Sequence, residues 1–282
     1  MPTLFDEYAK DSLFSMFKGE PGTRKSTSAL SYPTPQFWFS WDRKMNGLLL
    51  PAKHWGINPS DINYEDYQDW NKAEKKLKQL QTSCNYRTLI ADSITSCGDS
   101  IMSQAKRLKS GGVRKSGAQS GKLVAGIEVN ELEDYNAEAA ALLDMISILK
   151  DIHEYHGVHV ILIAHVIQAE YRNTTNNTTH VSRQIVTAAK KVAAKVPAYC
   201  EEVYHFNIDR GFDVGGEGSY ALLTEHTGDD FARTSLPLPK KIVFSNEQLY
   251  GRFIQPAMTE LKKFKPETKP NPTVPLTEKE GW

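Results

Sequence analysis

The chain has 282 residues, of which 40% are hydrophobic and 24% are charged, proportions that are ordinary for a soluble globular protein. This length accommodates one large α/β domain or two small domains. Thirty-four basic residues balance 34 acidic residues, which excludes a global basic field, so any nucleic-acid binding must come from a local patch.

The cysteines and the hydropathy pattern indicate the compartment. Cys84, Cys97 and Cys200 form no CxxC pair and no paired framework, which is typical of reduced thiols in a cytosolic protein. No apolar run reaches the roughly 18–20 residues needed to cross a membrane, and residues 1–7 do not form a signal peptide. We therefore expect a cytoplasmic protein that has no membrane partner.

The first predicted strand, residues 13–17, leads into a segment that resembles a phosphate-binding loop. The P-loop pattern is Gly, four residues, Gly-Lys and then Ser or Thr, and it must lie between a strand and a helix. Residues 27–30 can open that helix. The candidate nucleotide-binding residues are Gly19, Glu20, Pro21, Gly22, Thr23, Arg24, Lys25, Ser26 and Thr27.

Such a loop indicates a phosphate-containing ligand, because its backbone N–H groups and the N-terminus of the following helix both favour phosphate. Lys25 is expected to reach the β- and γ-phosphates and act in catalysis, and the Ser26 hydroxyl to ligate Mg²⁺. Arg24 stands where the pattern has its second Gly, which lets the backbone approach phosphate closely. Arg24 either weakens phosphate binding by the loop or contributes its own phosphate contact. The alternative interpretation of residues 19–27 as a whole is an ordinary structural turn that binds no nucleotide.

Two further predicted strands, residues 36–42 and 87–93, carry acidic residues near their ends, and a helix is expected between them over residues 67–81. Asp92 is suited to hold Mg²⁺ beside the P-loop serine, although it could instead cap the next helix. Asp42 is suited to orient the attacking water, although it could be a turn residue.

The middle of the chain alternates a basic segment, a helix and a strand. Residues 104–122 are rich in Gly, Ser, Lys and Arg and are expected to form a mobile loop. Residues 137–156 have helical apolar spacing, and residues 158–165 form a continuous apolar run typical of a central parallel strand. His165 ends that strand, where it could sense the γ-phosphate or simply be a hydrogen-bonded strand end.

The last third of the chain contains weaker signals. Residues 168–182 are polar and are expected to form a functional or disordered loop, in which Glu170 competes with Asp42 for the catalytic role. A short basic helix is expected over residues 188–196, and two strands, possibly antiparallel, over residues 202–208 and 219–224.

The domain division follows from composition. Residues 265–282 are dominated by Pro, Lys, Thr and Glu and are expected to be a disordered tail, which leaves residues 1–264 as one domain. Strands that alternate with helices predict an α/β fold with a mostly parallel twisted sheet flanked by helices and later antiparallel strands. The carboxyl ends of the parallel strands would then bring together the P-loop, Asp42, Asp92 and His165.

Several motifs in this order resemble a RecA-like P-loop ATPase core, and most closely the phage Sak-type single-strand annealing and recombination ATPases. The resemblance covers roughly residues 10–245. The segments that carry it are residues 19–27, 89–95, 160–166, 195–204 and 232–237.

The resemblance implies a RecA-like fold, ATP and Mg²⁺ as cofactors, ATP hydrolysis, assembly into rings or filaments, and single-stranded DNA binding in recombination. It also implies that residues 104–122 and 168–190 face the DNA, where cations would contact phosphates and Tyr171 would stack on a base; a solvated, flexible surface is the alternative. The nucleic-acid candidates are Lys106, Arg107, Lys109, Arg114, Lys115, Tyr171, Arg172, Arg183, Lys190 and Lys191. Candidates for a cation inserted into a neighbouring subunit's ATP site are Arg233, Lys240 and Lys241.

Two other functions remain open at this point. One is a different P-loop DNA motor, such as a helicase core. The other is a degenerate nucleotide-binding adaptor without hydrolysis, which would act through a protein partner of the 265–282 tail and which the Arg24 departure favours. A Lys25→Ala variant separates them, because a motor would lose its function and an adaptor would keep its partner.

Overall fold

The computed structural model of the chain describes residues 11–111, 123–124, 127–128, 132–173, 178–187, 190–210, 218–227 and 230–263. The predicted tail and two of the basic candidates, Arg114 and Lys115, lie outside these residues. The elements in chain order are β1 (Phe14–Gly19), α2 (Lys25–Leu30), β2 (Gln36–Ser40), η1 (Met45–Leu48), α3 (Leu49–His54), η2 (Pro59–Asp61), β3 (Ile62–Asp66), α4 (Trp70–Thr82), β4 (Thr88–Asp92), α5 (Ile94–Gly111), β5 (Leu123–Val124), β6 (Ile127–Glu128), α6 (Leu132–His156), β7 (His159–Asn173), β8 (Thr178–Ile185), α7 (Lys190–Tyr199), β9 (Glu202–Arg210), β10 (Ser219–Leu223), β11 (Lys241–Phe244), η3 (Tyr250–Ile254) and α8 (Gln255–Lys262).

One large sheet organises the described residues, with the strand order β11-β10-β9-β1-β7-β4-β2-β3 and β8 paired to β7. The strands from β9 to β3 are parallel, whereas β10 and β11 continue the sheet in antiparallel pairing. This arrangement confirms the predicted α/β class with a mostly parallel sheet and later antiparallel strands, as the resemblance to a RecA-like core implied.

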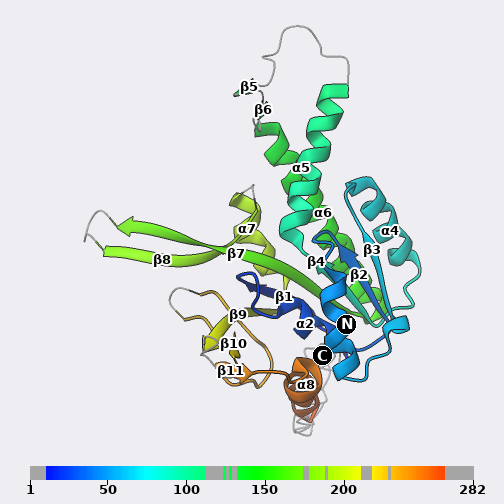
Figure 1. Cartoon of the computed structure of the whole chain (residues 1–282), viewed down its shortest axis with the longest axis vertical. Coiled ribbons are helices and arrows are strands. Elements are labelled where there is room, and N and C mark those ends of the chain that lie inside the picture. The colour runs from blue at the N-terminus through cyan, green and yellow to red at the C-terminus, as the bar shows by residue number, and fades with distance from the viewer. Residues whose placement is uncertain are drawn as a thin grey trace, which may run out of the picture.

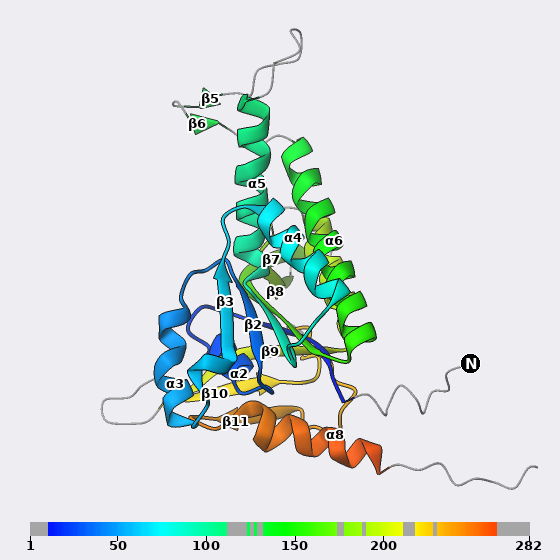
Figure 2. The same cartoon turned by 90° about the vertical axis from the view of Figure 1, so that its right-hand side faces the viewer.

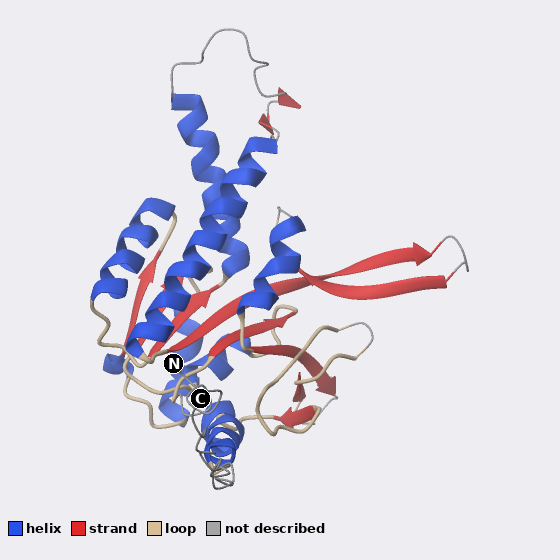
Figure 3. Ribbon diagram, turned by 180° about the vertical axis from the view of Figure 1, so that it is seen from behind, coloured by secondary structure: helices blue, strands red, loops and turns tan. Residues whose placement is uncertain are grey.

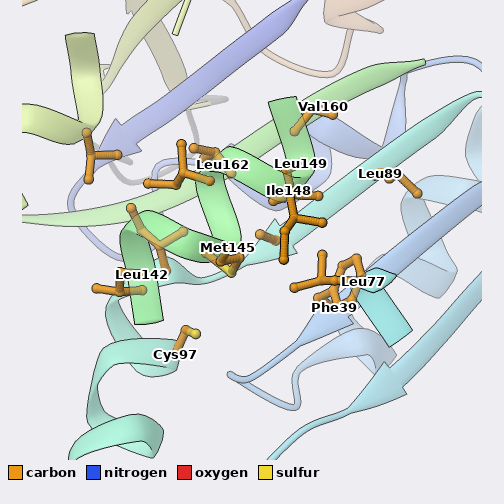
Figure 4. Packing of buried hydrophobic residues seen from close by; sticks show 14 of the residues in the cluster. Phe39, Leu77, Leu89, Cys97, Leu142, Met145, Ile148, Leu149, Val160 and Leu162 are labelled. Carbon is orange, nitrogen blue, oxygen red and sulfur yellow. The ribbon is translucent and has the colours of Figure 1, made fainter. Parts of the chain in front are cut away.

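Helices cover both faces of the sheet, so its central strands are buried on both sides, as parallel sheets require. Helices α4, α5, α6 and α7 pack on one face, where residues such as Leu77, Cys97 and Met145 meet apolar side chains of the strands (Figures 2 and 4). Helices α2, α3 and α8 pack on the other face around Trp38 and Phe206. None of the described helices is long and apolar enough to span a membrane.

The alternation of side chains along β7 shows how the sequence specifies this burial. Val160, Leu162 and Ala164 belong to the cluster on the α6 face, whereas Ile161 and Ile163 belong to the opposite cluster. Successive residues of a strand point to opposite faces, so a strand in the middle of a two-sided sheet must be apolar throughout. The continuous apolar run predicted this central position correctly.

In two segments that the sequence predicts as loops, the described residues form regular secondary structure. Helix α5 continues to Gly111 and, with α6, extends beyond the sheet (Figure 1), so the first eight residues of the expected 104–122 loop are helical. The expected 168–182 loop is instead a hairpin, because β7 continues to Asn173 and β8 returns antiparallel from Thr178 (Figure 3). Backbone pairing within the hairpin satisfies the polar backbone there, so no apolar periodicity is needed.

Candidate functional site

The predicted phosphate-binding loop lies between β1 and α2, at the carboxyl end of the parallel strands. Gly19 is in register with His165 of β7 and Phe206 of β9, so both neighbouring strands crowd its backbone. A Cβ atom at this position would lie 2.4 Å from the Phe206 carbonyl oxygen, which only glycine avoids. Gly22 has φ +82°, in the region that glycine adopts most readily.

Arg24, the departure from the P-loop pattern, adopts the backbone conformation that glycine would adopt. Its φ and ψ are 64° and 24°, a left-handed conformation, and it is the N-cap of α2. Its guanidinium Nη1 donates to the Ser245 carbonyl oxygen and to Asn246 Oδ1, the latter at 2.7 Å. The guanidinium also lies 4.7 Å from the centre of the Tyr220 ring. The loop therefore keeps its expected turn, while the side chain is anchored on the segment after β11.

Lys25 is buried within the loop that it follows. Its Nζ atom donates to the carbonyl oxygens of Gly19 at 2.8 Å and Glu20 at 2.7 Å. Burial lowers the pKa of Lys25 to about 8, although Asp92 and Asp42 act in the opposite direction. A buried ammonium whose hydrogen bonds go to neutral oxygens is a strong partner for an anion brought to this loop.

Ser26 and Asp92 face each other across the gap between α2 and β4. The Ser26 hydroxyl donates to Asp92 Oδ2 at 2.8 Å. Burial raises the pKa of Asp92 to about 6, and the hydrogen bond from Ser26 only partly offsets this effect. A hydroxyl and a carboxylate within hydrogen-bond distance fit Mg²⁺, which prefers oxygen ligands and retains several waters. A divalent cation would also favour the charged form of Asp92 that burial penalises.

Asp42 lies beside this pair and is held from three directions. Its Oδ1 accepts from the hydroxyls of Ser93, at 3.0 Å, and Ser96, and its Oδ2 lies 3.1 Å from His165 Nε2. Burial alone would raise the pKa of Asp42, but these hydrogen bonds outweigh it and hold the pKa below its usual value.

His165 is thereby linked directly to Asp42. The prediction that His165 ends its strand is wrong, because β7 continues to Asn173; His165 is instead the last residue of β7 that pairs with β1. Its backbone N–H donates to Thr95 Oγ1 at 3.1 Å. Its Nδ1 atom is buried and has no hydrogen-bond partner among the described residues. The four predicted catalytic residues, Lys25, Asp42, Asp92 and His165, therefore surround one place at the end of the sheet.

A cavity beside the loop was not predicted from the sequence. It has a volume of about 330 Å³ and opens next to the first turn of α2. Its lining residues are Arg24, Thr27, Leu50, Pro51, His54, Trp55 and Asn246. Trp55 Nε1 donates to the Asn246 carbonyl oxygen at 2.8 Å, which fixes the indole against the segment that also anchors Arg24. The only local signal was an aromatic, weakly periodic stretch after the 36–42 strand.

The nucleic-acid candidates within the described residues lie on helices α5 and α7 and on the β7–β8 hairpin. Lys106, Arg107 and Lys109 belong to α5, and Lys190 and Lys191 begin α7. On the hairpin, Tyr171 and Arg172 lie on β7, as does the competing acid Glu170, and Arg183 lies on β8. Among these candidates the side chain of Arg183 is described, and it pairs with Asp230 at 2.8 Å.

The three candidates for a cation acting on a neighbouring subunit all have partners within this chain. The Arg233 guanidinium donates to carbonyl oxygens at the end of α7, including those of Pro197, at 3.3 Å, and Cys200. Lys240 pairs with Glu225 at 2.9 Å, and Lys241 pairs with Asp209. The two lysine pairs are exposed or half-exposed, which is the kind of pair that exchanges partners at little cost.

The sequence and the fold were compared with those of known proteins. No protein family model matches the sequence, and no curated protein matches it. Among solved structures, the crystal structure of the RadB recombinase superposes with a TM-score of 0.47 and 14% sequence identity, over 84% of this chain and 88% of that chain.

Proposed function

We propose that this chain is a Mg²⁺-dependent ATPase with a RecA-like core that binds single-stranded DNA and acts in recombination, annealing or replication, as phage Sak-type proteins do. The observation that carries the proposal is the meeting of Lys25, Ser26 and Asp92 at the end of a loop with P-loop spacing. An amine, a hydroxyl and a carboxylate are the groups with which a P-loop protein binds a nucleoside triphosphate and its metal ion.

The phosphates would lie on the backbone of residues 19–26, and Lys25 would exchange the Gly19 and Glu20 carbonyls for phosphate oxygens. The cavity lined by Trp55 and His54 lies next to the same helix N-terminus and has room for a purine base. An indole and an imidazole there offer flat surfaces for stacking. The phosphate-binding loop and the cavity share Arg24, so one ligand can occupy both.

Mg²⁺ would be held by the Ser26 hydroxyl and, directly or through water, by the Asp92 carboxylate. When bound, the metal would neutralise charge on the β- and γ-phosphates. Asp42, which lies beside the Ser26–Asp92 pair, would orient the attacking water. Because its pKa is held below the usual value, Asp42 is a weak proton acceptor, so its role would be to orient water rather than to remove a proton early.

A second candidate function is an ATP-dependent switch that binds nucleotide but hydrolyses it very slowly. The observation that favours it is the engagement of Asp42 by Ser93, Ser96 and His165, which leaves its carboxylate to be rearranged before it can orient water. Such a protein would act as an adaptor, with the 265–282 tail as the segment available to a protein partner.

DNA binding is proposed for α5, the start of α7 and the β7–β8 hairpin, which carry Tyr171 and the basic candidates that the structure describes. Homo-oligomerisation into a ring or filament is proposed from the resemblance, with Lys240 and Lys241 as the cations more readily released toward a neighbour. The proposed location is the cytoplasm, that of the host cell if the protein is encoded by a phage.

The test is calorimetric ATP binding and steady-state hydrolysis with Mg²⁺, with and without a single-stranded oligonucleotide. Lys25→Ala is expected to reduce kcat/KM by about 100-fold or more, as loss of a transition-state charge partner does. Lys75→Ala, which removes an exposed lysine of α4, is the matched control. ATP binding without hydrolysis would favour the switch, and absence of ATP binding would contradict the proposal.

A further inference from the structure

A buried group of charged side chains lies between the phosphate-binding loop and the root of the β7–β8 hairpin. It contains Lys18 at the end of β1, His205 on β9, Arg183 on β8 and Asp230 on the segment between β10 and β11. Lys18, His205 and Asp230 are almost fully buried. Glu20, the second residue of the loop, lies at the edge of this group and is more exposed.

Arg183 is the member that joins the hairpin to the others. Its Nη1 atom lies 2.8 Å from Asp230 Oδ2, and its Nε atom lies 4.0 Å from Glu20 Oε1. The Nε atom is buried and has no hydrogen-bond partner among the described residues, so the guanidinium has an unused donor directed near the loop. One side chain therefore contacts both a buried anchor and the phosphate-binding loop.

Asp230 fixes one end of this connection. Its Oδ1 atom lies 3.6 Å from His205 Nε2, and burial lowers the pKa of His205. Burial also lowers the pKa of Lys18 to about 8, against the attraction of Asp230. Because a buried carboxylate needs cationic partners, Asp230 holds Arg183 in place.

Glu20 fixes the other end, because its main chain belongs to the nucleotide site. The Glu20 carbonyl oxygen accepts from Lys25 Nζ at 2.7 Å and from Thr23 Oγ1 at 2.8 Å. Any ligand that draws Lys25 away from this carbonyl changes the environment of Glu20. Phosphate charge brought to the loop also attracts the Arg183 guanidinium, whose Nε atom lies 4.0 Å from the Glu20 carboxylate.

The position of Arg183 in the hairpin determines which residues a change at Glu20 would affect. Arg183 is in register with Gln168 and lies two residues before Ile185, which is buried and ends β8. On the opposite strand, His165 reaches Asp42, and the Val186 N–H donates to the His165 carbonyl oxygen at 2.9 Å. Figure 1 shows the hairpin projecting from this root.

We propose that Arg183 is a positioning residue that transmits occupancy of the phosphate-binding loop to the β7–β8 hairpin through its contacts with Glu20 and Asp230. This inference rests on the proposed nucleotide site, whose regulation it describes. When triphosphate occupies the loop, the added negative charge holds the guanidinium more firmly, and the root of β8 opens less often. The hairpin, with its DNA-binding candidates, is thereby more ordered in the nucleotide-bound protein.

The test is hydrogen–deuterium exchange of peptides covering residues 178–187, with and without saturating ATP and Mg²⁺, which requires no DNA. In the wild-type protein we expect nucleotide to slow exchange about fivefold or more, the lower end of ordinary coupling between sites. Arg183→Gln should bind nucleotide and lose this protection. Glu20→Gln should weaken it and leave the Arg183–Asp230 pair intact, so this exposed variant tests the link even if Arg183→Gln fails to fold. Arg252→Gln, which removes an arginine paired with Glu247 elsewhere, should behave as wild type.

The outcomes separate this inference from the proposed function. Protection that is unchanged in both Arg183→Gln and Glu20→Gln would overturn the coupling. Nucleotide binding without any effect on residues 178–187 of the wild-type protein would overturn it as well, and would leave the nucleotide site standing. Absence of nucleotide binding in calorimetry would overturn the proposed function and this inference together.

Discussion

The left-handed conformation of Arg24 allows a test of how the loop tolerates its departure from the P-loop pattern. At φ 64° the Cβ atom of any L-residue other than glycine is crowded, and the cost is about 1–2 kcal/mol. Replacing Arg24 by Gly removes this cost and also removes the contacts of the guanidinium. Replacing it by Ala removes the same contacts and keeps the crowded Cβ. The comparison of the two variants therefore isolates the backbone term.

The magnitudes follow from the contacts. The hydrogen bonds to Ser245 and Asn246 contribute about 1 kcal/mol together at this partly exposed position. The contact with the Tyr220 ring adds about 0.5–1 kcal/mol. Arg24→Ala should thus lower the free energy of unfolding by about 1.5–2 kcal/mol. Arg24→Gly recovers about 1 kcal/mol of that loss after its larger unfolded-state entropy is counted.

The assay is urea unfolding followed by circular dichroism, with the midpoints of both variants compared at equal slope. Arg24→Gly should be about 1 kcal/mol more stable than Arg24→Ala. The matched pair is Lys75→Gly and Lys75→Ala on α4, an ordinary exposed helix position, where the order reverses because glycine disfavours helix by about 1 kcal/mol. Equal stability of the two Arg24 variants, or the helix-like order, would refute the assignment of strain to this backbone.

Three further predictions concern the core and the site. Burial lowers the pKa of His159 to about 3, and its Nδ1 accepts a hydrogen bond from the Leu13 N–H. The contribution of neutral His159 to stability is therefore complete above pH 6.5 and is lost as the pH falls. In urea unfolding from pH 7 to 4.5, the free energy of unfolding should fall by up to about 1.4 kcal/mol per pH unit, and His159→Gln should flatten this decline. Burial raises the pKa of Asp92 to about 6, so the ionised carboxylate destabilises the protein above that pH. Asp92→Asn should therefore stabilise the metal-free protein at pH 7.5 by up to about 3 kcal/mol and should abolish the Mg²⁺ dependence of ATP binding. A lower urea midpoint for this variant would contradict the prediction. Trp55→Ala should weaken ATP binding by about 1–3 kcal/mol in calorimetry and leave inorganic triphosphate binding unchanged, whereas equal losses for both ligands would argue against a base in the cavity.

The sequence was sufficient to predict the features that depend on local pattern. The apolar runs of β1, β4 and β7 and the spacing of the P-loop placed the loop, Asp92 and His165 at one edge of a parallel sheet. The reason is physical: strands covered on both faces must be apolar throughout, and parallel strands bring their carboxyl ends to the same edge. The sequence also predicted two later strands, over residues 202–208 and 219–224, that could be antiparallel, and β9 and β10 do pair in antiparallel fashion.

The remaining features depend on contacts between distant parts of the chain, which no local pattern records. The sequence of the β7–β8 hairpin beyond Val166 is mostly polar, so its strands lack the alternation that identifies a half-buried strand. The cavity combines residues of α3 with Asn246, and the buried charge group combines β1, β8 and β9 with Asp230. A segment with a loop-like composition can form either a loop or a paired strand, and the sequence alone does not show which strand it pairs with.

The antiparallel extension of the sheet explains why an arginine can stand in the phosphate-binding loop. Tyr220 on β10 and the two residues after β11, Ser245 and Asn246, supply a ring and two acceptors for its guanidinium. Asn246 also accepts from Trp55, so the segment that holds Arg24 in the left-handed turn is the segment that forms one wall of the cavity. A glycine at this position would reach the same turn through its own freedom but would have no link to that wall. Arg24 therefore holds the left-handed turn through tertiary contacts rather than through backbone freedom. The same contacts link the conformation of the phosphate-binding loop to the wall of the cavity beside it.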